Sequence, residues 1–111
     1  MITAIVRYEL PPSIGRAACR AHFLKISAGF GEVEGLIRKQ FIWNENGTAG
    51  GVYLWRSIED AKAFYQGPWL DGILERYEMY PEIEYFQTFA ITDNPGGVVT
   101  VIEELEVAHA R

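Results

Sequence analysis

Residues 35–56 read GLIRKQFIWNENGTAGGVYLWR, and this stretch decides the fold. Two runs rich in branched and aromatic residues, 35–44 and 50–56, lie on either side of a turn with the sequence ENGT. The Asn46-Gly47 pair in this turn is the strongest short-range signal for a β-hairpin. The sequence therefore predicts two antiparallel strands that are neighbours in one sheet.

Gly50 and Gly51 stand at the start of the second strand, where glycine is unusual. Glycine inside a strand costs conformational entropy and provides no packing, so it is best explained by a neighbour or ligand that approaches the backbone closely. We therefore predict a cavity beside these glycines. Gly50→Val is expected to weaken ligand binding because the new side chain would fill that cavity.

The segments before the hairpin predict one strand and one helix. Residues 2–9 are rich in branched residues, as in a strand, and Pro11 and Pro12 end this run. From residue 14 to about residue 30, apolar residues recur at helical spacing. Ser13 is the expected N-cap of that helix.

The segments after the hairpin predict helices followed by a strand. The sequence SIED at 57–60 resembles a capping box, so residues 58–65 should be helical. Pro68 is well placed to begin a second helical piece, and Pro81 ends it. Residues 82–92 are then the last main strand. The resulting order, βαββαβ, is that of the ferredoxin-like fold, an α+β fold whose antiparallel sheet carries its helices on one face.

Length and composition fit one such domain. The chain has 111 residues, 49% of them hydrophobic, which is enough for a single core. We assign residues 1–95 to the ferredoxin-like domain and residues 96–111 to a C-terminal arm, because the break DNPGG separates the two. The sequence VVTVI in the arm could pair with an exposed sheet edge, for example in a partner subunit.

Charge and cysteine content argue against several classes of partner. A net charge of −5 and an isoelectric point near 5.0 leave no basic patch for a phosphate backbone, so we expect no nucleic acid partner and no membrane partner. Neither a signal peptide nor an apolar run long enough to span a membrane is evident. Together with a single cysteine, Cys19, these features predict a cytoplasmic protein.

The register of the hairpin determines which side chains share a face. If Asn46-Gly47 forms a two-residue loop, residues whose numbers sum to 93 lie opposite each other. The face expected under the helices then carries Ile37, Lys39, Phe41, Trp43, Val52 and Leu54. The other face carries Leu36, Arg38, Gln40, Ile42, Tyr53 and Trp55.

That second face has no helices to cover it. With Ile5 of the first strand, the side chains of Ile42, Tyr53 and Trp55 would form a larger apolar patch than a soluble monomer usually exposes. A second copy of the same sheet is the simplest cover. We therefore expect a homodimer.

No cofactor or metal site is evident in the sequence. The two histidines, His22 and His109, have no cysteine partner at ligand spacing. Glycine-rich dinucleotide motifs, phosphate-binding loops and nucleophile elbows are absent as well. We expect no metal and no classical cofactor.

The aromatic content predicts a small-molecule site. The chain has 3 Trp, 6 Tyr and 6 Phe, more than a minimal core needs. We predict a cavity between the sheet and the helices that stacks one planar ring and is lined by Phe23, Phe41, Trp43, Tyr65 and Trp69. Packing in the core is the alternative role for each of these residues.

His22 and Lys39 are the candidate polar groups. His22 flanks the apolar stripe of its helix, so it could reach the cavity and act as a general base, with Tyr65 and Trp69 orienting the substrate. The alternative is that His22 faces water. Lys39 could hold a phenolate or enolate by its charge. However, the second strand is an edge strand, where lysine commonly prevents edge pairing, and we expect that role.

Five segments, in this order and spacing, resemble the YdhR-type family of monooxygenases, namely GLIRKQF, TAGGVYLW, AKAFY, WLDGILERY and PEIEYF. The resemblance covers about residues 2–95, and Lys39 matches a lysine of the family motif. It implies the dimeric α/β-barrel superfamily, in which two ferredoxin-like subunits pack sheet to sheet and each keeps a pocket between its sheet and helices. It also implies an oxygenase that acts on a small aromatic or quinol-like compound without metal or flavin.

Two other functions stay open, because a fold does not determine an activity. The pocket could belong to a non-catalytic protein that binds a small aromatic ligand. It could also belong to an enzyme with another reaction, such as isomerisation or haem breakdown.

Overall fold

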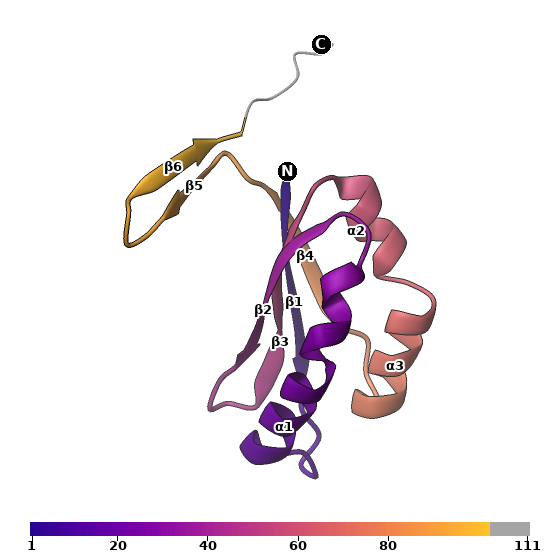
Figure 1. The fold of residues 1–111 in the computed structure, drawn as a ribbon. Coiled ribbons are helices and arrows are strands. Elements are labelled where there is room, and N and C mark those ends of the chain that lie inside the picture. The colour runs from indigo at the N-terminus through magenta and orange to yellow at the C-terminus, as the bar shows by residue number, and fades with distance from the viewer. Residues whose placement is uncertain (103–111) are drawn as a thin grey trace.

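The computed structural model describes residues 1–102, and they form a four-stranded antiparallel sheet with helices on one face (Figure 1). The strands are β1 (Ile2–Glu9), β2 (Leu36–Trp43), β3 (Thr48–Trp55) and β4 (Glu82–Gln87), in the order β2-β3-β1-β4. This is the predicted α+β, ferredoxin-like arrangement. Among the residues described, no helix is long and apolar enough to cross a bilayer.

The three α-helices begin in different ways. Helix α2 (Ile58–Phe64) has the predicted cap, because the Ser57 hydroxyl accepts a bond of 3.1 Å from the N–H of Asp60. Helix α3 (Pro68–Tyr77) begins at the proline, as predicted. Helix α1 (Arg16–Ile26) begins later than expected and continues as the 3₁₀ helix η1 (Ser27–Glu32).

Ser13 does not cap α1. The N–H of Ile14 bonds to the carbonyl of Pro11 at 2.9 Å, so the chain is still in a turn at this point. Gly15 precedes the first helical residue and provides no side-chain cap.

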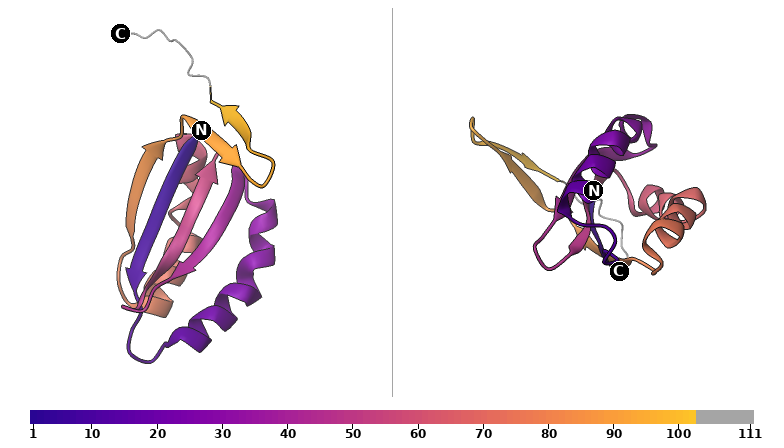
Figure 2. Two further views of the ribbon diagram at one scale, coloured as in Figure 1. Left: turned by 90° about the vertical axis from the view of Figure 1, so that its left-hand side faces the viewer. Right: turned by 90° about the horizontal axis from the view of Figure 1, so that it is seen from below.

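The last predicted strand is divided into two. The N–H of Thr88 still bonds to the carbonyl of Met1 at 3.0 Å, but Phe89 pairs instead with Ile102, whose N–H reaches its carbonyl at 2.9 Å. Strands β5 (Ala90–Asp93) and β6 (Val98–Val101) therefore form a separate hairpin. Figure 2 shows this hairpin on the side of the sheet opposite the helices. The remainder of the predicted arm, residues 103–111, lies outside the described residues.

The β2–β3 loop has three residues instead of the predicted two. Asn44 bonds to the carbonyl of Thr48 at 2.9 Å through its N–H, which leaves residues 45–47 in the loop. The side-chain oxygen of Asn44 accepts bonds from the N–H groups of Asn46 and Thr48 at 3.0 and 3.1 Å. Gly47 adopts a positive φ of 85°, as the last residue of such loops requires.

This extra loop residue corrects the predicted register. Lys39 lies opposite Tyr53 and Phe41 lies opposite Gly51, so the paired numbers sum to 92 and residues of equal parity share a face. Tyr53 and Trp55 therefore point towards the helices, whereas Val52 and Leu54 lie on the open face. The predicted faces hold for Ala4 and Val6 of β1 and for β2 from Arg38 onwards. They are wrong at the start of β2, because a register shift between Leu36 and Arg38 places Leu36 opposite Trp55 and against the core, whereas Ile37 is 49% exposed.

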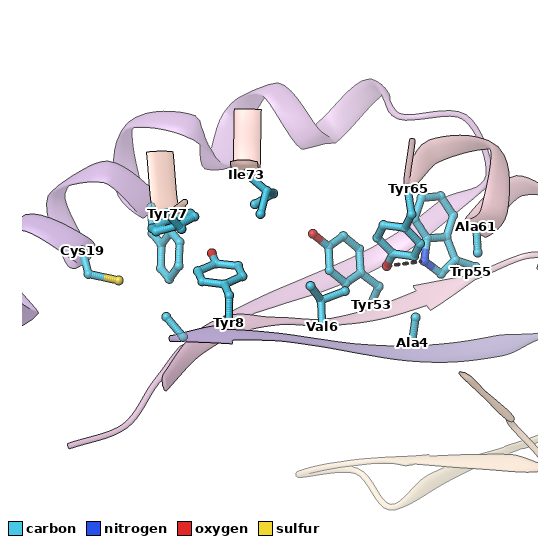
Figure 3. Packing of buried hydrophobic residues seen from close by; sticks show 12 residues of the cluster. Ala4, Val6, Tyr8, Cys19, Tyr53, Trp55, Ala61, Tyr65, Ile73 and Tyr77 are labelled. Atoms are coloured by element: carbon cyan, nitrogen blue, oxygen red, sulfur yellow. Dashed lines mark hydrogen bonds between the residues drawn. The ribbon is translucent and has the colours of Figure 1, made fainter. Parts of the chain in front are cut away.

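The core consists mainly of aromatic side chains between the sheet and the helices (Figure 3). Trp55 is fully buried, and its indole N–H donates a bond of 3.0 Å to the Tyr65 hydroxyl. The ring of Tyr53 stacks on that of Trp55 with centroids 5.9 Å apart. Tyr53 and Trp55 were expected at a subunit interface, but they stabilise the core of the single chain instead.

Candidate functional site

A cavity of about 270 Å³ opens between the sheet, α1 and α3. An apolar cavity of about 150 Å³ can hold benzene, so this one can take a substituted or bicyclic ring. Its lining combines aromatic, aliphatic, basic and small residues, and comprises Tyr8, His22, Phe23, Ile26, Phe30, Lys39, Gly50, Tyr53, Pro68, Trp69, Gly72, Ile73, Arg76 and Tyr77.

Helical spacing explains why α3 contributes several of these residues. Trp69, Gly72, Ile73 and Arg76 follow the i, i+3, i+4, i+7 pattern, so they lie on one face of the helix. That face is turned towards the sheet, because Ile73 is buried in the core. The helix thus brings an indole and a guanidinium to the same cavity.

The structure divides the predicted site residues into three places. His22, Phe23 and Trp69 line the cavity. Phe41 and Trp43, with Phe23, line a separate groove of about 190 Å³ between α1 and β2. Tyr65 packs against Trp69, with ring centroids 4.9 Å apart, and bonds to Trp55 in the core.

Lys39 points into the cavity, although edge protection was its expected role. Its Nζ lies 3.6 Å from the ring centroid of Phe30, 3.9 Å from that of Phe41 and 4.6 Å from that of Tyr53. These ring faces attract an ammonium group. Burial has the opposite effect and lowers the pKa of the Lys39 amine to about 7.

Replacing Lys39 by Met should stabilise the ligand-free protein. The amine's pKa is depressed from 10.5 to about 7 on folding, so the unfolded chain binds more protons between these pH values. The free-energy cost of burying the Lys39 ammonium therefore reduces stability fully below pH 7 and disappears as the pH rises to about 10.5. At pH 6.5 we expect the free energy of unfolding to rise by about 2 kcal/mol. Thermal unfolding at pH 6.5 and pH 10 checks this, and a gain that persists undiminished at pH 10 would contradict it.

The two glycines of β3 have different roles. A Cβ on Gly51 would lie 2.8 Å from Cε of Lys39, so the lysine side chain occupies the space that a residue at position 51 would need. Gly50 has a φ of 156°, and its Cβ would collide with the backbone carbonyl of Val6 in β1. Gly50 does line the cavity, as predicted, but the space that a side chain would need is occupied by Lys39 at Gly51 and by the neighbouring strand at Gly50.

The tyrosine hydroxyls of the cavity stay protonated near neutral pH. Burial raises the pKa of Tyr8, with a further contribution from the Tyr77 hydroxyl, and burial raises that of Tyr53, which the nearby Trp69 indole offsets in part. Both hydroxyls point away from the sheet towards the helices (Figure 3). They can therefore donate hydrogen bonds to a ligand.

His22 is half-buried on α1 and lines the cavity. Burial lowers its pKa, and the positive charges of Arg76, Lys25 and Lys39 lower it further. The imidazole is therefore neutral at pH 7 and can accept a proton, as a general base must. Within residues 1–102, no group of three or more His, Cys, Asp or Glu side chains has an arrangement suited to a metal ion.

Sequence reasoning missed Arg76, Tyr8, Tyr53 and Tyr77 as cavity residues. Tyr8 could have been found, because it alternates with Ala4 and Val6 on the helix-covered face of β1. Tyr53 was missed because of the register. Arg76 lies in the last turn of the amphipathic helix α3. No feature of the sequence indicates whether a guanidinium at that position points into the cavity or into solvent.

No protein-family profile matches the sequence, and no curated protein sequence is detectably similar to it. Solved structures share its fold at low identity. A provisionally named antibiotic biosynthesis monooxygenase from Deinococcus radiodurans has a TM-score of 0.62 and 11% identity over 79% of this chain and 92% of that one.

Two further structures extend this likeness. NE2512 from Nitrosomonas europaea, a protein of unknown function, has a TM-score of 0.63 and 14% identity over 96% of this chain and 95% of its own. SnoaB, a cofactor-independent oxygenase from Streptomyces nogalater, has a TM-score of 0.52 and 14% identity over 85% of this chain and 96% of its own. At these identities the likeness establishes the fold.

Proposed function

We propose that the protein is a cofactor-independent monooxygenase that oxidises a small aromatic phenol or quinol. The observation that carries this proposal is the aromatic cavity, which places a neutral histidine beside ring-stacking side chains. Two analogies support the proposal. The chain shares its fold with SnoaB, and its GLIRKQF and TAGGVYLW segments resemble the YdhR-type family.

The reaction needs a base, a dry site and dioxygen. His22 removes a proton from the substrate, and the electron-rich anion then reduces dioxygen directly. For an anthrone-type substrate, the ring CH₂ becomes a carbonyl, one oxygen atom enters the product, and the other leaves as water with the two hydrogens. Phe23 and Trp69 would hold the ring and exclude water from the anion.

Oxygen consumption tests this activity. The protein would be incubated in air with hydroquinones, naphthols and anthrones while oxygen uptake and product mass are recorded. We expect uptake with a product 14 mass units heavier for an anthrone, as CH₂ becomes C=O. Tight binding without turnover across the panel would instead favour the non-catalytic ligand-binding protein.

His22→Ala should lower turnover by roughly 100-fold, with little change in substrate affinity, because a general base acts in the transition state. Arg20→Ala is a suitable control, because Arg20 is an exposed residue on the same helix that does not line the cavity and is not among the charges that lower the pKa of His22. Steady-state oxygen uptake gives both parameters. A His22→Ala variant as fast as the parent would remove the histidine from the mechanism.

We also propose that two copies pack through their open sheet faces. That face carries the half-buried side chains of Ile5, Val52 and Leu54. The β5–β6 hairpin beside it exposes further apolar side chains, with Phe89 at 64% and Val101 at 70%. A second sheet would cover both, over roughly 800 Å² per subunit.

Deleting residues 96–111 should leave the four-stranded sheet folded and weaken this dimer, because β6 pairs only with β5 among the described strands. Light scattering measures the mass and circular dichroism the fold. A truncated chain that fails to fold would show that the hairpin belongs to the core.

A further inference from the structure

We propose that the ligand of this cavity is an aromatic anion, a ring that carries a carboxylate or an ionised hydroxyl, and that Lys39 is its counter-ion. The inference deepens the proposed function by naming the charge of its substrate. It is carried by the geometry around Lys39 and by the distribution of charge over the cavity wall.

The Lys39 ammonium has no anionic partner in the described part of the chain. Its Nζ lies among the rings of Phe30, Phe41 and Tyr53, and no salt bridge reaches it. A buried charge without a partner is costly. A ligand anion in the cavity would provide the missing partner in a desolvated setting, where ion pairing is strongest.

The cavity wall is basic although the protein is acidic. The chain carries a net charge of −5, yet the charged residues that line the cavity are Lys39 and Arg76, together with the titratable His22. No Asp or Glu is among the lining residues. The Arg76 guanidinium comes from α3 and Lys39 from β2, so cations from two different elements contribute to one wall.

Two buried hydroxyls add hydrogen-bond donors. Tyr8 and Tyr53 are 6% and 2% exposed, with the Tyr77 hydroxyl beside that of Tyr8 and the Trp69 indole, which can only donate, beside that of Tyr53. Buried hydroxyls are normally bonded. A ligand oxyanion would accept bonds from both, because these phenols keep their protons.

Gly51 is the sequence feature that makes room for Lys39. A side chain there would displace Cε of Lys39, so glycine at this position keeps the amine directed over β3 towards the cavity. Gly51→Ala should therefore move the amine and weaken binding of an anion more than binding of a neutral ring.

The affinity should also fall as the pH rises. The titratable and charged groups that line the cavity with Lys39 are His22 from α1, Arg76 and Tyr77 from α3, Tyr53 from β3 and Tyr8 from β1. Burial raises the pKa of Tyr8 and of Tyr53, so both keep their protons through neutral pH. Lys39, with a pKa of about 7 before ligand binding, loses its charge above that value. Protonation and anion binding therefore support each other below about pH 7, and His22 adds charge only at more acid pH.

A matched pair of probes isolates the charge. 2-Naphthoate and 2-naphthamide have nearly the same shape, and only the first is an anion between pH 6 and 9. Titration calorimetry at pH 6.5 should give at least about tenfold tighter binding of the naphthoate, and the preference should decrease at pH 8.5.

Variants identify the counter-ion. Lys39→Met should lose at least about tenfold in naphthoate affinity and little in naphthamide affinity, whereas Lys39→Arg should keep part of the preference. Lys62→Met removes the same charge from α2, outside the cavity, and should change neither affinity. Circular dichroism confirms that each variant is folded.

Equal affinities of the parent for the two probes, or a preference that survives in Lys39→Met, would overturn the inference. Its failure is distinguishable from failure of the oxygenase proposal, because binding is measured without turnover. A protein that prefers the anion but consumes no oxygen keeps the inference and loses the oxygenase. A protein that oxidises only neutral rings and shows no preference for the anion keeps the oxygenase proposal and overturns the inference about Lys39.

Discussion

Gly50→Val should prevent folding at 37 °C. A Cβ at position 50 would meet the carbonyl of Val6, which belongs to the backbone of the adjacent strand and cannot rotate away. The φ of 156° adds strain for any residue with a side chain. Separation of β1 from β3 would be required, and this pairing lies at the centre of the sheet. We expect a loss of more than about 4 kcal/mol in the free energy of unfolding.

Circular dichroism and thermal unfolding measure this effect, with Gly51→Ala as the neighbouring control. The Cβ of Gly51→Ala meets the side chains of Lys39 and Tyr53 and the carbonyl of Gln40 at distances of 2.8 to 3.3 Å. Since the closest atom is the end of a flexible side chain, this variant should fold. A folded Gly50→Val protein that only binds ligand more weakly would instead match the expectation drawn from the sequence.

Trp55→Asp should unfold the protein, whereas Leu54→Asp should yield a folded monomer. Trp55 is fully buried and bonded to Tyr65, so an aspartate there places a charge in the core without a partner. The expected loss exceeds about 4 kcal/mol. Leu54 is next in sequence but lies on the open face, where the proposed dimer would bury it. A charge there acts on the interface alone.

Light scattering combined with circular dichroism separates the two outcomes. The parent should have the mass of a dimer at micromolar concentration, and Leu54→Asp half of that mass with an unchanged spectrum. A parent that is monomeric would refute the dimer. A folded, monomeric Trp55→Asp protein would restore the register predicted from the sequence.

The sequence predicted the order of the elements because their signals are local. The Asn46-Gly47 turn, the Ser57 cap and Pro68 each act within a few residues. Ser57 and Pro68 mark the correct helix starts, and Asn46-Gly47 lies in the loop of the predicted hairpin. The prediction that Ser13 caps α1 was wrong because the turn from Pro11 to Ile14 is not complete at Ser13, and the helix begins only at Arg16. The last predicted strand is divided because β1 pairs with it only as far as Gln87. The length of this pairing depends on the whole sheet and is not encoded near residue 87.

The faces of β3 could not be predicted in the same way. β1 alternates clearly, so Ala4 and Val6 identify its buried side. In β3 the residues from Val52 to Trp55 are all apolar, so alternation gives no preference and the loop alone sets the register. The hydrogen bonds that the Asn44 side-chain oxygen accepts, which the sequence does not reveal, stabilise a loop of three residues.

The candidate site was predicted in part for the same reason. His22 and Phe23 were predicted from helical spacing and Trp69 from the aromatic content, and all three line the cavity. Lys39 was placed on the correct face but assigned to edge protection, because its three aromatic neighbours come from η1, β2 and β3. Convergence of distant segments on one amine is visible only in three dimensions.

The three-residue loop also has a consequence for homologous sequences. Adding or removing a single residue at 45–47 would reverse the parity of the pairing, so Lys39 and Tyr53 would no longer share a face. A change of two residues would preserve it. Among relatives that keep this cavity, insertions and deletions in the loop should therefore occur in pairs, and a single-residue gap should be accompanied by a compensating bulge in β2 or β3.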